Sequence, residues 1–295
     1  MDIRNVQKTG NMFYIYLPTN WCKKRNIKRA SKVSIEEAND GSLVIHPQVV
    51  ENKKTHLSIN LGSLKQKLNT RIINKFIVAA YINPADSFVI HLPNKMDMLN
   101  VFDQKKLLNI EFVDFDRQHI SCESPMRIEE PYLLLKTMIK KIKSMLYVMT
   151  NNYHKELIEK YEDEIDKSKL LIEKSVVSSM ISYKTPIKPI TLHYIGIIAK
   201  ELEIMVDYTK ELDKKQKQFF DKIGSFLSEL QELLENIENK RIDFGAVISL
   251  FLKCDRARAK KSSYYKSRIS SSMIIISETI IDWLVTNYIL EQKHG

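Results

Sequence analysis

Glycine is scarce in this chain of 295 residues, which has only seven, at positions 10, 41, 62, 196, 224, 245 and 295. No two of them lie close enough to form a GxGxxG motif or a Walker-type phosphate loop, which excludes the common nucleotide-binding loops. Because glycine destabilises helix interiors, its scarcity also favours a helix-rich fold.

Cysteine and metal-binding motifs are equally sparse. The three cysteines, Cys22, Cys122 and Cys254, form no CxxC pair, and the seven histidines form no HExxH motif. These spacings indicate neither a zinc knuckle nor a disulfide framework.

Long apolar runs are absent as well. The most hydrophobic stretch, Met273 to Leu290, is interrupted by Glu278 and Asp282, and the first residues show no signal-peptide pattern. We therefore expect a cytoplasmic protein with no membrane insertion.

Positive charge is in excess, with 46 Lys and Arg against 36 Asp and Glu, a formal net charge of +10. It is concentrated in two runs. Lys23 to Lys32 holds six basic residues and no acid, and Lys253 to Arg268 holds seven with only Asp255 against them. Such runs suggest a polyanion or an acidic membrane surface as partner, and the simpler alternative is a solvated lysine-rich face.

Residues 1–48 carry the pattern of a small β domain with one short basic helix that begins near Pro18. Thr9-Gly10-Asn11 and Asn39-Asp40-Gly41 are turn signals. The strands expected around these turns are Asp2–Gln7, Met12–Leu17, Lys32–Glu37 and Ser42–His46.

The run V-Q-K-T-G-x-x-x-x-I-x-L-P-x-x-W (Val6 to Trp21), followed by a short helix and K-V-S-I-E-E-x-x-D-G-S-L-V-I, resembles an AbrB/SpoVT-type swapped-hairpin DNA-binding domain. The resemblance implies two chains that interlace their hairpins into one small β-barrel, and hence a homodimer. Size argues the same way, because so short a β segment buries too little surface to fold well alone.

The resemblance also implies the residues that contact DNA, which lie on the first strand and loop and at the start of the short helix. They are Arg4, Lys8, Asn11, Lys23 and Lys24, with Arg25 adjacent. Asn11 stands where the family commonly has arginine, and Cys22 replaces one basic helix position. These departures favour phosphate contacts over base contacts.

Residues 55–122 predict a small α/β connecting domain that acts as a spacer or dimer support. Arg71 to Ile90 resembles a middle segment of archaeal PhoU-like regulators. The expected elements are a strand at Leu57–Leu61, a helix at Leu64–Tyr81 and strands at Ser87–His91 and Ile110–Phe115.

Residues 127–292 are expected to be helical nearly throughout, because apolar residues recur at spacings of three and four. A 75-residue offset relates Glu203 to Glu278 and Asp207 to Asp282, which indicates a duplication. We predict a pair of three-helix bundles, about 127–213 and 215–292, and an α+β fold for the whole chain. The six helices are expected at about 128–151, 154–181, 188–213, 215–239, 243–268 and 271–292.

Two carboxylate pairs, Glu203/Asp207 and Glu278/Asp282, each lie one turn apart on a helix face. The simplest interpretation of the first pair is a solvated surface. The second pair supplies the only charges from Met273 to Leu290, so we expect it to face a polar partner, a cation or a cleft.

Both pairs resemble the E-x-x-x-D motif of PhoU proteins, which implies divalent or ferric metal ions helped by acids on the second helix. The candidates there are Glu162, Asp163 and Asp166. In the second repeat the matching helix offers Asp255 among basic residues, which would repel a cation.

The functional expectation is a DNA-binding transcriptional regulator of phosphate uptake, whose PhoU-like helical domain senses phosphate status through a metal or a partner. The alternative is a signalling adaptor that docks on a phosphate transporter or sensor and dimerises through its N-terminal domain. A metal-dependent hydrolase is disfavoured, because no nucleophile–base pair accompanies the carboxylates. We therefore expect no enzymatic activity.

Overall fold

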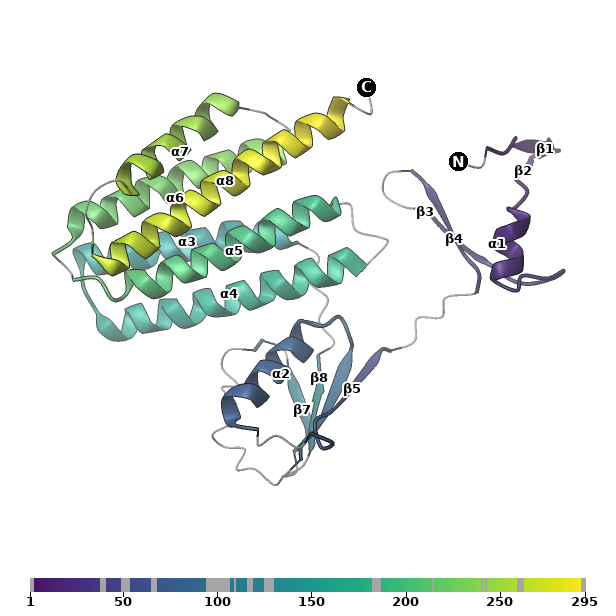
Figure 1. Cartoon of the computed structure of the whole chain (residues 1–295), viewed down its shortest axis with the longest axis horizontal. Helices are drawn as coiled ribbons and strands as arrows, with labels where there is room; N and C mark the ends of the chain where they lie inside the picture. Colours follow the sequence, from purple (N-terminus) through teal and green to yellow (C-terminus); the bar gives the residue numbers. More distant parts are fainter. Residues whose placement is uncertain are drawn as a thin grey trace. The chain divides into compact units, whose positions relative to one another are not determined.

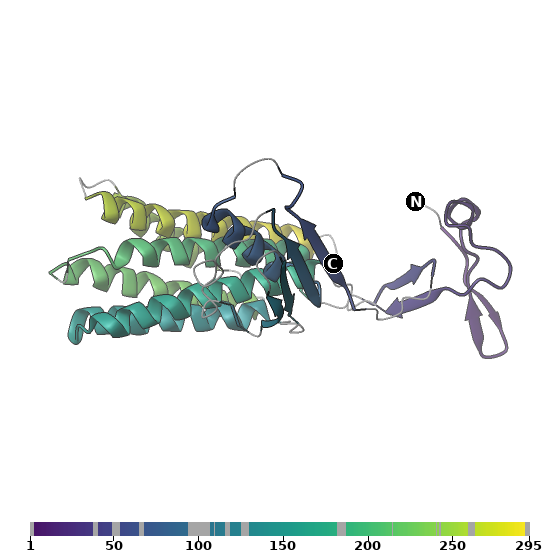
Figure 2. The same ribbon diagram turned by 90° about the horizontal axis from the view of Figure 1, so that it is seen from below.

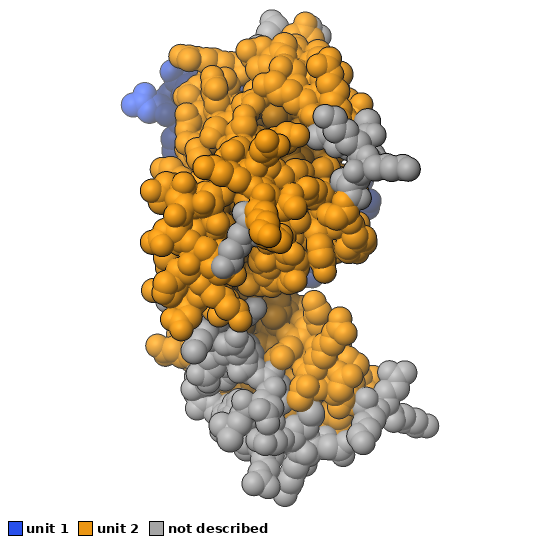
Figure 3. Space-filling model, turned by 90° about the vertical axis from the view of Figure 1, so that its left-hand side faces the viewer, with its two compact units in different colours: residues 1–53 blue, residues 54–295 orange. Residues whose placement is uncertain are grey.

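The computed structural model shows a mixed α+β protein, as expected from the sequence, and its described strands form no closed barrel. The chain divides into two compact units, residues 1–53 and 54–295, which are coloured separately in Figure 3. The structure describes residues 3–37, 41–48, 54–64, 68–93, 107–108, 110–115, 119–124, 130–181, 187–213, 215–239, 241, 243–258 and 263–292.

Unit 1 consists of two antiparallel hairpins and one short helix. Gly10, at the tip of the first hairpin, has φ +59°, a left-handed conformation that favours glycine. Asn39 and Asp40 of the second expected turn lie outside the described residues. The elements are β1 (Gln7–Thr9), β2 (Met12–Tyr14), α1 (Thr19–Lys24), β3 (Ser34–Glu37) and β4 (Leu43–His46).

The first two strands are shorter than predicted, and the expected strand Asp2–Gln7 is wrong, because β1 starts only at Gln7. Residues 3–6 and 15–17 carry strand-forming side chains but are not in strands. A strand exists through its hydrogen bonds to a neighbour. In the described part of the chain the ladder of this hairpin ends at the pair Gln7 and Tyr14, so neither segment is assigned to a strand.

Unit 2 begins with a four-stranded sheet in the order β5-β6-β8-β7. Its strands are β5 (His56–Asn60), β6 (Ser87–His91), β7 (Glu111–Phe115) and β8 (His119–Glu123). Helix α2 (Thr70–Ile82) connects β5 to β6, which pair in parallel, and its buried residues pack on the sheet. It begins later than predicted, because the Asn69 side chain caps it by accepting from the Ile72 amide at 2.9 Å.

Strand β8 has no counterpart among the predicted elements, although Ile120 and Cys122 alternate with polar residues as a half-buried strand requires. It pairs antiparallel with both β6 and β7. The predicted α/β segment is therefore a sheet with one helix and one extra strand.

Six helices lie alongside one another in the rest of unit 2 (Figures 1 and 2). They are α3 (Pro131–Asn151), α4 (Lys155–Ile181), α5 (Pro189–Thr209), α6 (Lys217–Glu238), α7 (Phe244–Arg258) and α8 (Tyr264–Gln292). The predicted division between helices 243–268 and 271–292 is wrong, since α8 already starts at Tyr264. The second basic run is therefore split between two helices.

One continuous apolar core joins all six helices. Trp283 of α8 is fully buried, and its ring lies 5.9 Å from that of Tyr132 on α3 and 5.8 Å from that of Tyr194 on α5. The two sets of three helices predicted from the sequence thus share their interior.

Helix α8 is long and apolar enough to cross a membrane by length and composition, over Tyr264–Ile289. Within its most apolar window, however, 61% is buried inside the protein. The core position of the helix accounts for this composition.

Lys174 of α4 joins the helices to the sheet. It is only 4% exposed, and its ammonium group donates to the backbone carbonyl of Tyr81 at 3.0 Å and to the hydroxyl of Ser124. It also lies 4.4 Å from the centre of the Tyr81 ring. Burial lowers the pKa of Lys174 to about 8, although the nearby Asp86 opposes the shift.

This buried amine predicts a pH-dependent stability. Between about pH 8 and 10.5 the folded state has released the proton of Lys174 while the unfolded state keeps it, so stability gains with rising pH. The free energy of unfolding of the wild type minus that of Lys174→Met should rise by on the order of 1–3 kcal/mol over this pH range. Urea unfolding of both proteins at several pH values measures it, and a constant difference would contradict the assignment.

Candidate functional sites

The first candidate site is the basic surface of unit 1. Lys23 and Lys24 form the last turn of α1, and Arg25 is its C-cap. All three are exposed, as are Lys28, Arg29 and Lys32. The end of α1 and the segment after it thus present a run of cations to solvent with no acid between Lys23 and Lys32, which suits the phosphates of a nucleic acid.

The other candidate residues of this surface lie on and before the first hairpin. Arg4, Lys8 and Asn11 are all exposed, and Asn11 is at the turn between β1 and β2. The Lys8 ammonium group lies 5.2 Å from the centre of the Phe13 ring. Arg4 lines a mostly polar depression of about 270 Å³ together with Asn5, Gln7 and Tyr16.

The described residues of unit 1 form no interior of their own. None of its described residues is buried, although many are large and apolar. The apolar side chains exposed by 42% to 80% are Ile3, Val6, Met12, Phe13, Tyr14, Ile15, Tyr16, Ile35 and Leu43. So large an exposed apolar surface on a small domain marks an interaction surface.

The second candidate site is a cluster of three carboxylates. Asp166 of α4 and Glu203 and Asp207 of α5 are half-buried, and one oxygen of each lies within 4.8 Å of the others. The packing of α4 against α5 brings these residues together across 37 positions of sequence. Three carboxylates can offer the several oxygen ligands that a hard divalent cation such as Mg²⁺ or Ca²⁺ requires.

The electrostatics of the cluster also fit a cation. Burial raises the pKa of Glu203, and the charges of Asp207, Asp166 and Glu173 add to the shift, while Lys169 opposes it. Lys169 is itself paired with Glu173 at 2.8 Å. The negative charge on Glu203 is therefore destabilised, and a bound cation would relieve this repulsion.

The remaining predicted metal ligands do not join the cluster. Glu162 forms an ion pair with Lys210, and Asp163 is exposed. Glu278 and Asp282 are also exposed, and no third acid or histidine of the described chain completes a site with them.

The two pairs differ in burial. The pair interpreted as solvated, Glu203/Asp207, is half-buried, whereas Glu278/Asp282, the pair expected to face a polar partner, a cation or a cleft, is exposed on α8. The orientation of α8 about its own axis explains the exposure of the second pair. On α8 the buried face is formed by residues such as Ile276, Ile280, Trp283 and Leu284, which leaves Glu278 and Asp282 on the opposite side.

Next to the carboxylate cluster lies a group of residues that the E-x-x-x-D motif does not include. The Arg268 guanidinium lies 5.2 Å from the centre of the Tyr208 ring, which also contacts Tyr264 edge-on at 5.9 Å. Hydrogen bonds with Tyr264 and Arg268 lower the pKa of Tyr208. These residues come from α5 and α8, and only the adjacency of Tyr208 to Asp207 links them to the motif in the sequence.

Comparison of the chain with protein-family models, curated proteins and solved structures gives no match. The assignment of function therefore rests on the residues, their geometry and the resemblances carried by the sequence motifs.

The carboxylate cluster predicts a cation-dependent gain in stability. Wild-type protein should show a rise in melting temperature with added Mg²⁺, Ca²⁺, Mn²⁺ or Fe³⁺, and Glu203→Gln should lose most of this gain. Without metal the same variant should be more stable by about 0.2–0.5 kcal/mol, since it removes a like-charge contact.

Glu278→Gln is the matched control, because it changes the same residue type at the same motif position on an exposed helix face. It should leave the metal response unchanged. Equal loss in both variants, or no metal response of the wild type, would contradict a specific site at Asp166, Glu203 and Asp207.

Proposed function

We propose that this protein is a dimeric, DNA-binding transcriptional regulator of phosphate uptake. The observation that carries the proposal is the composition of the unit 1 surface, which combines a continuous set of exposed cations with an apolar surface that the single chain leaves uncovered. The cations suit DNA phosphates, and the apolar surface suits a second copy.

The proposed dimer forms through the swapped hairpins that the sequence resemblance implies. Residues 3–6 and 15–17 are not assigned to strands, and the apolar side chains among them that are largely exposed are Ile3, Val6, Ile15 and Tyr16. Association with another copy would bury Phe13, Ile15 and Ile35, which are exposed in the single chain. Such a dimer doubles the number of cations presented to DNA.

Within this proposal the helical domain is a PhoU-like sensor. The Asp166, Glu203 and Asp207 cluster supports metal binding there, through three carboxylates whose repulsion a cation relieves. The connection with phosphate rests on the resemblance of the two E-x-x-x-D motifs to PhoU proteins.

DNA binding is tested by fluorescence anisotropy with duplex DNA from phosphate-transport promoters. Affinity should fall steeply with salt, and Lys23→Glu combined with Lys24→Glu should weaken binding at least tenfold. The double variant should also flatten the log–log salt dependence by about one for each lysine that no longer neutralises a phosphate. Lys140→Glu combined with Lys160→Glu, which reverses two exposed charges on α3 and α4, should bind as the wild type does.

If the wild-type dimer bound DNA without salt sensitivity, or not at all, the regulator proposal would fail. The alternative of an adaptor that docks on a phosphate transporter or sensor would then gain support, because dimerisation alone would account for the apolar surface of unit 1. Retained binding by the double variant would show that α1 is not the contact surface.

Dimerisation is tested by the molar mass in solution. Ile35 is 60% exposed and lies opposite Ile45 in the β3–β4 hairpin. Ile35→Asp should convert a dimer to a monomer and abolish DNA binding, because it places a charge in the surface proposed to be buried. Light scattering after size exclusion measures it, with Ile248→Asp on the exposed side of α7 as control. A variant that remained dimeric would overturn the role of this surface.

A further inference from the structure

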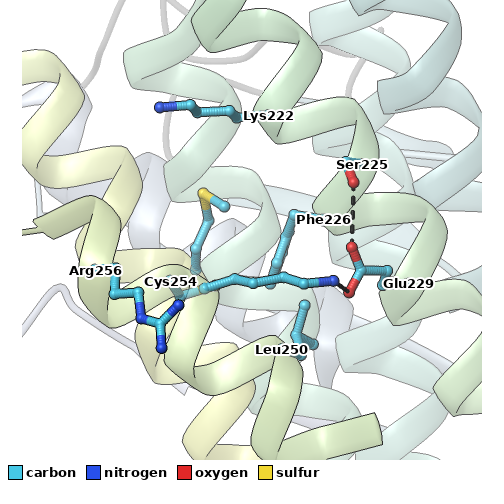
Figure 4. Close-up of a pocket in the computed structure, with 9 residues that line it drawn as sticks. Lys222, Ser225, Phe226, Glu229, Leu250, Cys254 and Arg256 are labelled. Atoms are coloured by element: carbon cyan, nitrogen blue, oxygen red, sulfur yellow. Dashed lines mark hydrogen bonds and ion pairs between the residues drawn. The ribbon is translucent and has the colours of Figure 1, made fainter.

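A cavity of about 490 Å³ lies among α6, α7 and α8 (Figure 4). Cavities of roughly 300–1,000 Å³ are typical of sites for small organic molecules. The lining of the cavity includes none of the three clustered acids.

The floor of the cavity is apolar and comes from all three helices. Phe226 of α6, Leu250 and Cys254 of α7 and Met273 of α8 are each at most 6% exposed. Burial raises the pKa of the Cys254 thiol, which accepts a hydrogen bond from the Ser277 hydroxyl at 3.6 Å and stays neutral. The floor therefore offers contact to hydrocarbon and contributes no charge.

The rim of the cavity is basic. Lys222 projects from α6, and Lys253 and Arg256 project from α7. The one acid of the lining is Glu229, whose carboxylate accepts from Lys253 at 2.8 Å and from Ser225 at 3.1 Å (Figure 4).

The balance of charge at the rim is positive. Glu229 neutralises Lys253, while neither Lys222 nor Arg256 has an acidic partner in the described part of the chain. Two cations are thus available to an anion at the mouth. The Lys253–Glu229 ion pair also links α7 to α6 across the cavity, where the direct packing of these helices is sparse compared with that of α7 on α8.

We propose that this cavity binds an amphipathic organic anion. Its hydrocarbon part would pack on Phe226, Leu250 and Met273, and its carboxylate or phosphate would lie at the mouth near Lys222 and Arg256. The apolar floor favours the hydrocarbon part of such a ligand, and the basic rim favours its anionic group. An inorganic anion would leave the floor uncovered, and a neutral hydrocarbon would leave the two cations without a partner.

This proposal explains a part of the sequence that the DNA-binding proposal does not use. The second basic run begins at Lys253 on α7, the helix that supplies half of the rim. Binding at the cavity would give the bundle a second ligand of a different chemical class from the metal, and the proposal stands independently of DNA binding.

The test is calorimetric titration of the full-length protein with octanoate and with octyl phosphate, below the concentrations at which either forms micelles. Octanol and inorganic phosphate are the two partial ligands. We expect both anionic amphiphiles to bind at least tenfold more tightly than either partial ligand, and the tighter of the two identifies the head group.

Two kinds of variant locate the site. Leu250→Trp fills the apolar floor, and Lys222→Glu combined with Arg256→Glu reverses the rim. Each should weaken binding of the amphiphiles at least tenfold. Their matched controls are Ile248→Trp, on the exposed side of the same helix, and Lys140→Glu on α3, and these should bind as the wild type does.

Circular dichroism and the melting temperature establish that each variant is folded, and the rim variant keeps the test decisive if the tryptophan disrupts the core. Three results would overturn the proposal: no binding of either amphiphile, binding of octanol or inorganic phosphate as tight as that of octyl phosphate, or unchanged binding by the folded rim variant.

Discussion

The apolar core around Trp283 is the interaction on which the six helices of unit 2 depend. Its indole contacts Tyr132 and Tyr194, so α8, at the end of the chain, is packed directly against α3 and α5. The Tyr132 hydroxyl in turn donates to the backbone carbonyl of Leu234 on α6. Four helices thus meet at one cluster, and the rotation of each helix about its own axis is fixed by which side chains it contributes. One helix of the carboxylate cluster, α5, and two helices of the basic-rimmed cavity, α6 and α8, belong to this arrangement.

Unit 1 differs from unit 2, because its apolar side chains are exposed rather than packed in a core. Its hairpins are well formed, yet the described residues include no buried side chain, so the free energy of burying apolar surface is not gained within one chain. The same short segment carries the densest set of cations in the protein. In the proposed regulator these two features act together. The association that covers the apolar surface also brings two basic helices into one dimer, so the dimer can contact DNA at two places.

Much of the fold could be predicted, because it follows from local patterns. Apolar spacing predicts the helical seams of α3, α5 and α6, and residues such as Leu135, Ile198 and Leu230 are fully buried as that spacing requires. Turn chemistry predicts both hairpins of unit 1. The errors lie where the local signal is weak. β8 is a short strand defined by its neighbours β6 and β7, and the first strand of unit 1 begins only at Gln7, later than the β-branched residues before it predict.

The sequence by itself determined the α+β class, the concentration of positive charge between Lys23 and Lys32, and the identity of the acids that were candidates for a metal site. Only the tertiary structure decided which of those acids meet. Asp166 joins Glu203 and Asp207 because α4 packs on α5, while the equally spaced Glu278 and Asp282 face outward because Trp283 and its neighbours turn the other side of α8 into the core. The cavity between α6, α7 and α8 could not be predicted from the sequence for the same reason. Periodicity shows that a helix has a buried face, but the space left between helices depends on how three such faces pack against one another.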